Sequence, residues 1–252
     1  MITPLTTWTK AQRMPVPELE ADLAQPAAGD VFGEDELNGL PAPVQGYFRA
    51  SIAHGTPLAL AARIAMHGSI KIAGRWMPFR ATEVLAPHRG FVWSASVAGG
   101  LFAGSDQYAS GLGAMRWKIL GLIPVVQAEG PDVSHSAAAR AGAESVWVPT
   151  ALLPRFGVNW TADDDTHLTA RYTVDNTPLV VRYELDEAAR IVTAQIDRWA
   201  TRTTLAPGAC IRSALRRRPA PRSMASAFRV KEEWAGSPAA SSGPTASSSA
   251  SR

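Results

Sequence analysis

The stretch AMRWKILGLIPVVQAEGPDVSHSAAARAGAESVW, residues 114–147, contains the change of pattern that decides the fold. Its first half is rich in branched and aromatic residues and is broken by Gly and Pro, which is typical of short β-strands. Its second half is rich in Ala and offers Asp132 and Ser134 as N-caps, which predicts a helix over about residues 134–146. One helix inserted among strands indicates an α+β protein.

Strand-like segments lie on both sides of this helix. Before it they are residues 58–72, 74–86, 89–97, 105–113 and 114–130; after it they are residues 158–161, 167–174, 179–185 and 191–199. Short strands separated by turns, without long helices between them, favour antiparallel pairing. We therefore expect a curved, mostly antiparallel β-sheet, a half-barrel similar by analogy to the lipoprotein carriers, with one N-terminal helix at about 43–53 and one central helix.

The chain divides into three parts. Residues 1–35 are rich in Pro and Ala and are expected to form a loosely structured arm, within which residues 16–26 could form a short helix. Residues 36–199 form the single β-rich domain. Residues 200–252 differ in composition, because 38 of these 53 residues are Ala, Ser, Arg, Pro or Gly. Such low complexity predicts a disordered tail.

The positive charge is concentrated in this tail. The whole chain has a formal net charge of +3, but residues 200–252 hold nine basic and two acidic residues, whereas the rest holds 16 basic and 20 acidic residues. A nucleic-acid-binding protein needs its basic residues on a folded face, so we expect no nucleic acid as a partner. Cys210, the single cysteine, also lies in the tail, which excludes a disulfide framework and a cysteine nucleophile in the domain.

No apolar run reaches the roughly 18 residues that a membrane-spanning helix needs. The N-terminal residues lack a charged segment followed by an apolar one, so no signal peptide is predicted. A cytoplasmic location is the expectation.

If each codon of the tail is read one base earlier in the gene, the tail encodes a different amino-acid sequence. With permitted third bases, residues 200–214 become GDPDNTGTWRLHPFG, and residues 236–250 become WFSGSELWPDGEFFR. Both strings contain Trp, Phe and Gly in place of Ser and Ala, and both look like folded protein. We therefore expect residues 200–252 to be an out-of-frame reading of a C-terminal segment.

Five segments carry a resemblance to a known family: LPAPVQGYF (residues 40–48), GFVW (90–93), LGLIP (120–124), GPDV (130–133) and ESVWVPTALLP (144–154). Together they make the chain, over about residues 36–199, similar to an uncharacterised bacterial family, DUF6544. The resemblance implies that the chain continues past Arg198 and Trp199 into segments like the two shifted strings. It implies no activity.

Three groups of residues are candidates for a ligand-binding site. Arg140 and Glu144 stand four apart on the predicted helix, so they form either a surface ion pair or a charged pair directed into the sheet. Asp106 and Tyr108 alternate on one strand and either line a pocket or occupy an edge or turn. The tryptophans are either pocket walls or ordinary core; those assigned to the site are Trp93, Trp117 and Trp147.

Catalytic and metal-binding signatures are missing from the sequence. The five histidines have no metal-ligand spacing, and there is no nucleophile elbow, P-loop or dinucleotide fingerprint. We expect no metal and no cofactor. The preferred hypothesis is a module that binds an apolar or amphipathic small molecule in the concave face of the sheet. The alternatives are an enzyme that uses Glu144, Arg140 or Asp106, and a structural or partner-binding domain.

Overall fold

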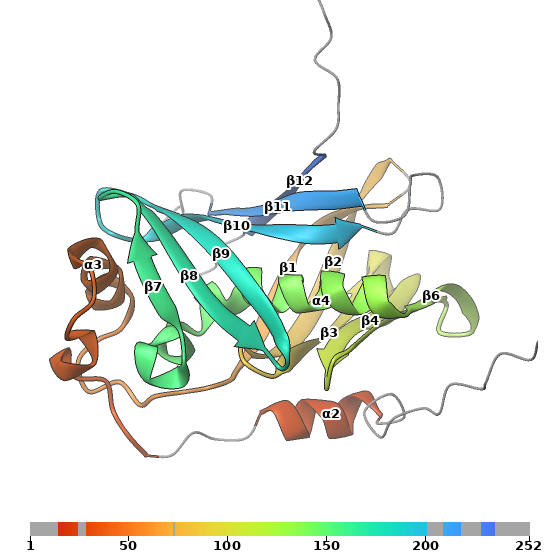
Figure 1. The fold of residues 1–252 in the computed structure, drawn as a ribbon. Coiled ribbons are helices and arrows are strands. Elements are labelled where there is room, and N and C mark those ends of the chain that lie inside the picture. The colour runs from red at the N-terminus through yellow and green to blue at the C-terminus, as the bar shows by residue number, and fades with distance from the viewer. Residues whose placement is uncertain (1–14, 25–28, 73, 201–208, 218–227, 235–252) are drawn as a thin grey trace, which may run out of the picture.

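A computed structural model describes residues 15–24, 29–72, 74–200, 209–217 and 228–234. It confirms an α+β protein whose strands pair antiparallel. The elements form two sheets with a helix between them (Figure 1).

The first sheet is a meander in which six strands follow one another in chain order. Its strands are β1 (Ala62–Ile72), β2 (Arg75–Ala86), β3 (Gly90–Val97), β4 (Phe102–Ala109), β5 (Leu112–Ile119) and β6 (Ile123–Glu129). The segment expected as one strand at residues 114–130 is a hairpin, because Leu120 and Gly121 take positive φ angles and turn the chain.

The second sheet begins after the central helix. It contains β7 (Asn159–Ala162), β8 (His167–Val174), β9 (Thr177–Leu185) and β10 (Ile191–Ala200), and β11 (Ala209–Arg217) and β12 (Phe228–Trp234) continue it beside β10. The predicted disordered, out-of-frame tail otherwise falls outside the described residues.

The expectation of one curved half-barrel is wrong. The strands are divided between two sheets, and neither is closed or strongly curled. The reason lies at residues 131–156, which carry the chain away from the edge strand β6. This segment contains the helix α4 (Pro131–Glu144) and the short 3-10 turns η3 (Ser145–Trp147), η4 (Pro149–Leu152) and η5 (Pro154–Phe156). Strand β7 then pairs with β8 and starts a new sheet.

Helix α4 runs between the two sheets and contacts β5 on one side and β10 on the other. Small residues allow this close approach. A Cβ at Gly113 of β5 would lie 2.7 Å from the carbonyl oxygen of Val133, and a Cβ at Gly142 would lie 2.6 Å from a methyl group of Leu179. The Ala residues that predict the helix therefore also let it fit between two layers.

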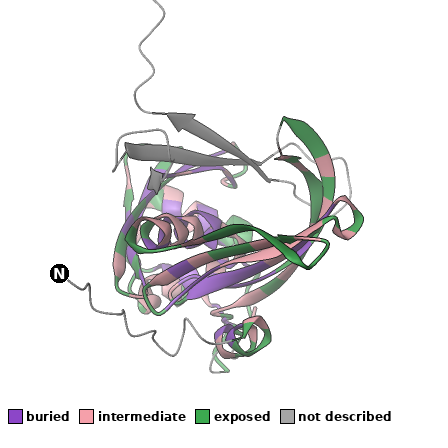
Figure 2. Cartoon of the chain, turned by 90° about the vertical axis from the view of Figure 1, so that its right-hand side faces the viewer, coloured by how far each residue is buried: buried purple, intermediate pink, exposed green. Residues whose placement is uncertain are grey.

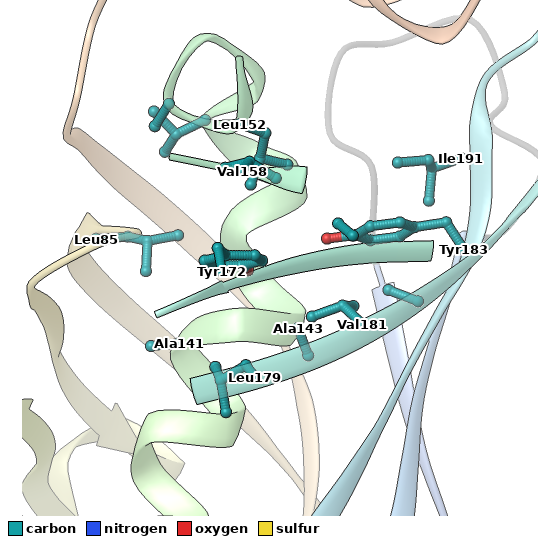
Figure 3. Close-up of a cluster of buried hydrophobic side chains, with 14 of the residues drawn as sticks. Leu85, Ala141, Ala143, Leu152, Val158, Tyr172, Leu179, Val181, Tyr183 and Ile191 are labelled. Atoms are coloured by element: carbon teal, nitrogen blue, oxygen red, sulfur yellow. The ribbon is translucent and has the colours of Figure 1, made fainter. Parts of the chain in front are cut away.

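The main core lies where the two sheets, α4 and α3 (Ala42–Ser51) meet. Figure 2 shows buried residues gathered in this central region. Figure 3 shows part of the core, in which Tyr172, Leu179 and Val181 of the second sheet lie beside Ala141 and Ala143 of α4. The predicted helix at 43–53 is α3, and its Tyr47 and Phe48 rings pack on Trp160 at centroid distances of 5.7 and 5.6 Å.

Two further helical segments belong to the N-terminal part, η1 (Glu34–Leu37) and α2 (Val16–Leu23), and η2 (Ala98–Gly100) joins β3 to β4. Helix α2 forms in the segment for which the sequence allowed either a short helix or a loosely structured arm. Its Leu19 and Leu23 pack against Val84 and Val92 on the outer face of the first sheet. No helix in the described part of the chain is long and apolar enough to cross a membrane.

Candidate functional site

The inner face of the first sheet, which is the face that packs on α4, carries a row of acidic and aromatic residues. Strand pairing places Glu83 of β2 opposite Trp93 of β3, and Trp93 opposite Asp106 of β4. Side chains directly opposite one another on a sheet face have Cβ atoms about 5 Å apart, so the two acids flank the indole. Two of these strands thus direct a carboxyl group toward α4.

Helix α4 supplies the opposite charge through Arg140. The Arg140 Nε donates to both oxygens of Glu144, at 3.0 and 3.1 Å, and Nη1 donates to Asp106 Oδ2 at 3.1 Å. Nη2 lies 3.9 Å from Glu83 Oε1. One guanidinium therefore faces three carboxyl groups, and we call Glu83, Asp106, Arg140 and Glu144 the charge cluster.

Aromatic rings form the walls of the charge cluster. The guanidinium carbon of Arg140 lies 4.6 Å from the ring centroid of Phe91 and 5.0 Å from that of Trp93, which is cation–π geometry. Trp117 Nε1 donates to Asp106 Oδ1 at 2.8 Å, and its ring centroid lies 5.6 Å from that of Trp93. Asp106 is thus held between a tryptophan and an arginine.

Gly104 allows this position of Trp117. A Cβ at Gly104, which pairs with Trp117 across β4 and β5, would lie 2.6 Å from the indole ring. Without that Cβ, the ring can lie across the glycine. From there its N–H reaches Asp106.

Glu83 is the least satisfied member of the cluster. Its side chain is fully buried, and neither carboxyl oxygen has a hydrogen-bond partner among the described residues. Burial, and next the negative charge of Glu144, raise the pKa of Glu83 well above its usual value, although Arg140 opposes this. Glu83 is therefore harder to deprotonate than an ordinary glutamate.

The same surroundings also shift the pKa values of Asp106 and Arg140. Burial raises the pKa of Asp106, while Arg140 and the hydrogen bond from Trp117 act in the opposite direction. Burial alone would lower the pKa of Arg140, but the carboxyl groups of Glu144, Glu83 and Asp106 together raise it, so the guanidinium stays charged. The charge cluster thus combines three carboxyl groups with one guanidinium.

The structure brings together five of the seven residues assigned to the site from sequence: Trp93, Asp106, Trp117, Arg140 and Glu144. The Arg140–Glu144 pair is directed into the sheet and is not a surface pair, since the Glu144 side chain is only 7% exposed.

Tyr108 and Trp147 lie elsewhere. The Tyr108 hydroxyl points toward the second sheet and lies 3.0 Å from Thr177 Oγ1. Trp147 is half-buried in η3, where it packs against the main core. The contacts described for these two residues support the fold.

Sequence reasoning missed Glu83 and Phe91. The signal for Glu83 was its position, because Ala81, Glu83 and Leu85 alternate on the inner face of β2. That signal was obscured because α2 also covers the outer face at Val84 and Ala86, so both faces of the strand are apolar here. Among the described residues, no group of three or more His, Cys, Asp or Glu side chains is arranged to hold a metal ion.

The fold and the site define an α+β protein with two antiparallel sheets and an arginine–carboxyl cluster buried between the first sheet and a central helix. A family model described as a family of unknown function, DUF6544, matches residues 30–207, and the chain belongs to this family. The match includes the whole of the region, about residues 36–199, over which the sequence resembles it. Searches of curated proteins and of solved structures each found no match.

Proposed function

We propose that this protein binds an amphipathic small molecule whose apolar chain lies on the inner face of the first sheet and whose polar end meets the charge cluster. The observation that carries this proposal is that the apolar inner face extends beyond α4 as a half-exposed surface. Helix α4 packs directly on the sheet near Phe91 and Gly113, so the ligand surface lies next to the helix and not beneath it.

The strand register defines this surface. Next to the row of Glu83, Trp93 and Asp106 comes a row with Met66 and Trp117, and the rows after it are apolar as well. The half-buried members of those further rows are Phe79, Phe102, Ile119, Ile70 and Met77. Half-exposed apolar side chains on adjacent strands form a continuous surface that an alkyl chain could cover.

The charge cluster favours a cationic or hydrogen-donating polar end. It holds three carboxyl groups and one guanidinium, and the Arg140 nitrogens already face those carboxyl groups. Asp106 and Arg140 are 16% and 19% exposed, so the cluster is accessible on the side of Trp117. An ammonium group there would meet a carboxylate and an aromatic face, whereas an anionic head would be repelled.

Native mass spectrometry of the full chain tests for a co-purified small molecule. Tryptophan fluorescence, titrated with decylammonium, 1-decanol and decanoate below their micelle concentrations, then tests the class of ligand. We expect decylammonium to bind with the lowest Kd. The Phe102→Asp variant should weaken all three probes, while Val180→Asp, which changes an exposed apolar residue of the second sheet, should not. If no probe binds the folded wild-type chain, the proposal fails.

A second candidate is an enzyme that uses the Glu83–Glu144 pair as a general acid. It is favoured by one observation: Glu83 is fully buried beside a guanidinium and the carboxyl group of Glu144, and burial raises the pKa of Glu83, as in sites that use a carboxyl group as an acid. Under this alternative, Glu83→Gln would bind the ligand but leave it unchanged, while the wild-type chain would convert it. Mass spectrometry of the ligand after incubation separates the two roles.

A further inference from the structure

At one end of the first sheet, the turns and the outer face carry side chains that the proposed ligand site on the inner face does not use. Because its six strands form a meander, the turns of the β1–β2, β3–β4 and β5–β6 hairpins lie at one end of the sheet. The backbone N–H of Leu120 donates to the carbonyl oxygen of Leu101 at 2.9 Å, which joins two of these turns. We call residues 66–80, 94–105 and 115–128 the hairpin end.

Large apolar side chains are exposed at the hairpin end. Leu122, at the turn between β5 and β6, is 80% exposed, and Trp76, at the start of β2, is 62% exposed. The other exposed members are Leu101, Leu120, Ile123, Val125 and Val126. Single exposed apolar residues are ordinary, but a group of this size on adjacent turns marks an interaction surface.

The charge of the hairpin end has one sign. Its three segments contain no Asp or Glu. Its basic residues are Lys71, Arg75, Arg80, Arg116 and Lys118, and all five are exposed. Alternation along β5 puts Arg116 and Lys118 on the outer face, beside the apolar β5–β6 turn. Helix α2, which carries Glu18 and Glu20, covers the outer face near the opposite end of the sheet.

We propose that the hairpin end docks on the surface of a lipid bilayer that contains anionic lipids. Leu120, Leu122 and Ile123 enter the headgroup region, and the flanking basic side chains contact lipid phosphates. Exposed apolar side chains next to basic ones are the combination that binds such an interface, where each basic residue adds attraction that salt weakens. In Figure 1 the β1–β2 turn and the β5–β6 hairpin both lie on the right-hand side of the molecule.

This inference does not rest on the proposed ligand, because the docking side chains at the turns and on the outer face differ from those of the inner-face ligand surface, although both sets lie at this end of the sheet. A protein partner is the competing occupant, since β6 is an edge strand that could pair with another copy of the chain. The charge favours the bilayer over a second copy. Two copies joined at their hairpin ends would bring ten basic side chains together with no acidic ones.

Vesicle flotation with the full chain tests the proposal. We expect binding to vesicles of phosphatidylcholine with about a third phosphatidylglycerol, little binding to phosphatidylcholine alone, and weaker binding as salt rises. Leu122→Asp, and the double variant Arg116→Glu with Lys118→Glu, should each lower the partition coefficient by about tenfold or more. The matched controls Val180→Asp on β9 and Arg190→Glu in the β9–β10 turn, both exposed, should bind as the wild type does.

A measurement on the wild-type chain guards against variants that do not fold. Lipids brominated in the upper part of their acyl chains should quench tryptophan fluorescence, and Trp76→Phe should reduce this quenching. The proposal is overturned if the wild-type chain does not bind anionic vesicles, or if the controls lose binding as the hairpin variants do. It is also overturned if the wild-type chain self-associates, Leu122→Asp abolishes the self-association, and no vesicle binding is seen.

Discussion

At the scale of single residues, the protonation of Glu83 decides the electrostatic balance of the interior. A fully buried carboxylate without hydrogen bonds would be strongly destabilising, and burial accordingly raises the pKa of Glu83 well above its usual value. Arg140 faces Glu83, Asp106 and Glu144, and its positive charge opposes this rise.

A pH series on Glu83→Gln tests this interpretation. The pKa of Glu83 is raised in the folded state above its ordinary value of 4.5, so its contribution to stability is complete below that pH. As pH rises, the unfolded chain loses this proton before the folded chain does, and the wild type loses about 1.4 kcal/mol of unfolding free energy per pH unit until the folded pKa is reached. The glutamine variant has no such proton to lose.

Urea unfolding of both chains between pH 4.5 and 8 provides the measurement. We expect the variant to gain stability relative to the wild type as pH rises, because the amide introduced by Glu83→Gln does not titrate, while the wild type loses the contribution of its raised pKa. Asp106, whose pKa is also raised, is present in both chains and does not affect the difference. A difference that stays constant over the whole pH range would contradict a raised pKa of Glu83.

At the scale of elements, α4 is the part on which the site depends. It is buried on several sides, and its Ala138, Ala139, Ala141 and Ala143 are small enough to let both sheets approach. The helix therefore places Arg140 and Glu144 against the first sheet, while Gly142 contacts the second. A bulkier helix would separate the sheets and remove Arg140 from Asp106.

Gly113→Ala tests how closely α4 must approach β5. The added Cβ would lie 2.7 Å from the carbonyl oxygen of Val133 and 2.8 Å from the Cα of Ser134, and backbone atoms cannot move aside as a side chain can. We expect a loss of about 1–3 kcal/mol in unfolding free energy, the usual cost of overpacking. Gly29→Ala is the matched control, because no atom lies within 4 Å of its added Cβ. Equal stability of the two variants would mean that α4 can shift without cost.

At the scale of the whole molecule, the chain after Trp199 has a composition unlike that of the domain. Residues 209–217 and 228–234 pair beside β10 as β11 and β12. Few residue types account for most of residues 200–252, whereas the shifted reading contains Trp and Phe. We propose that the shifted reading encodes the segment that this domain packs against.

A chain in which residues 200–252 are recoded in the shifted frame tests this proposal. It should unfold at a higher temperature than the present chain, because aromatic residues can bury apolar surface that Ser and Ala cannot. A control chain with the same new residues in scrambled order separates sequence from composition. An unfolding temperature that is no higher than that of the present chain would contradict the proposal.

Much of the secondary structure could be predicted, because it depends on neighbours in sequence. Alternation predicted the strand at His167–Val174 with its observed bounds, and Ala content together with capping residues predicted α4 to within three residues. Helical spacing put Arg140 and Glu144 on one face. The family could be recognised because its motifs are local strings of residues.

The division into two sheets and the identity of the charge cluster required the tertiary structure. Alternation shows which residues share a face of one strand, but it does not show which strands pair or which face another element covers. Alternation puts Val84 and Glu83 on opposite faces of β2, but it does not show that α2 covers the face with Val84 and α4 the face with Glu83. Sequence by itself therefore determined most of the elements, their order and five of the site residues. Only the packing of α4 between two sheets decided that a fully buried Glu83 completes the site.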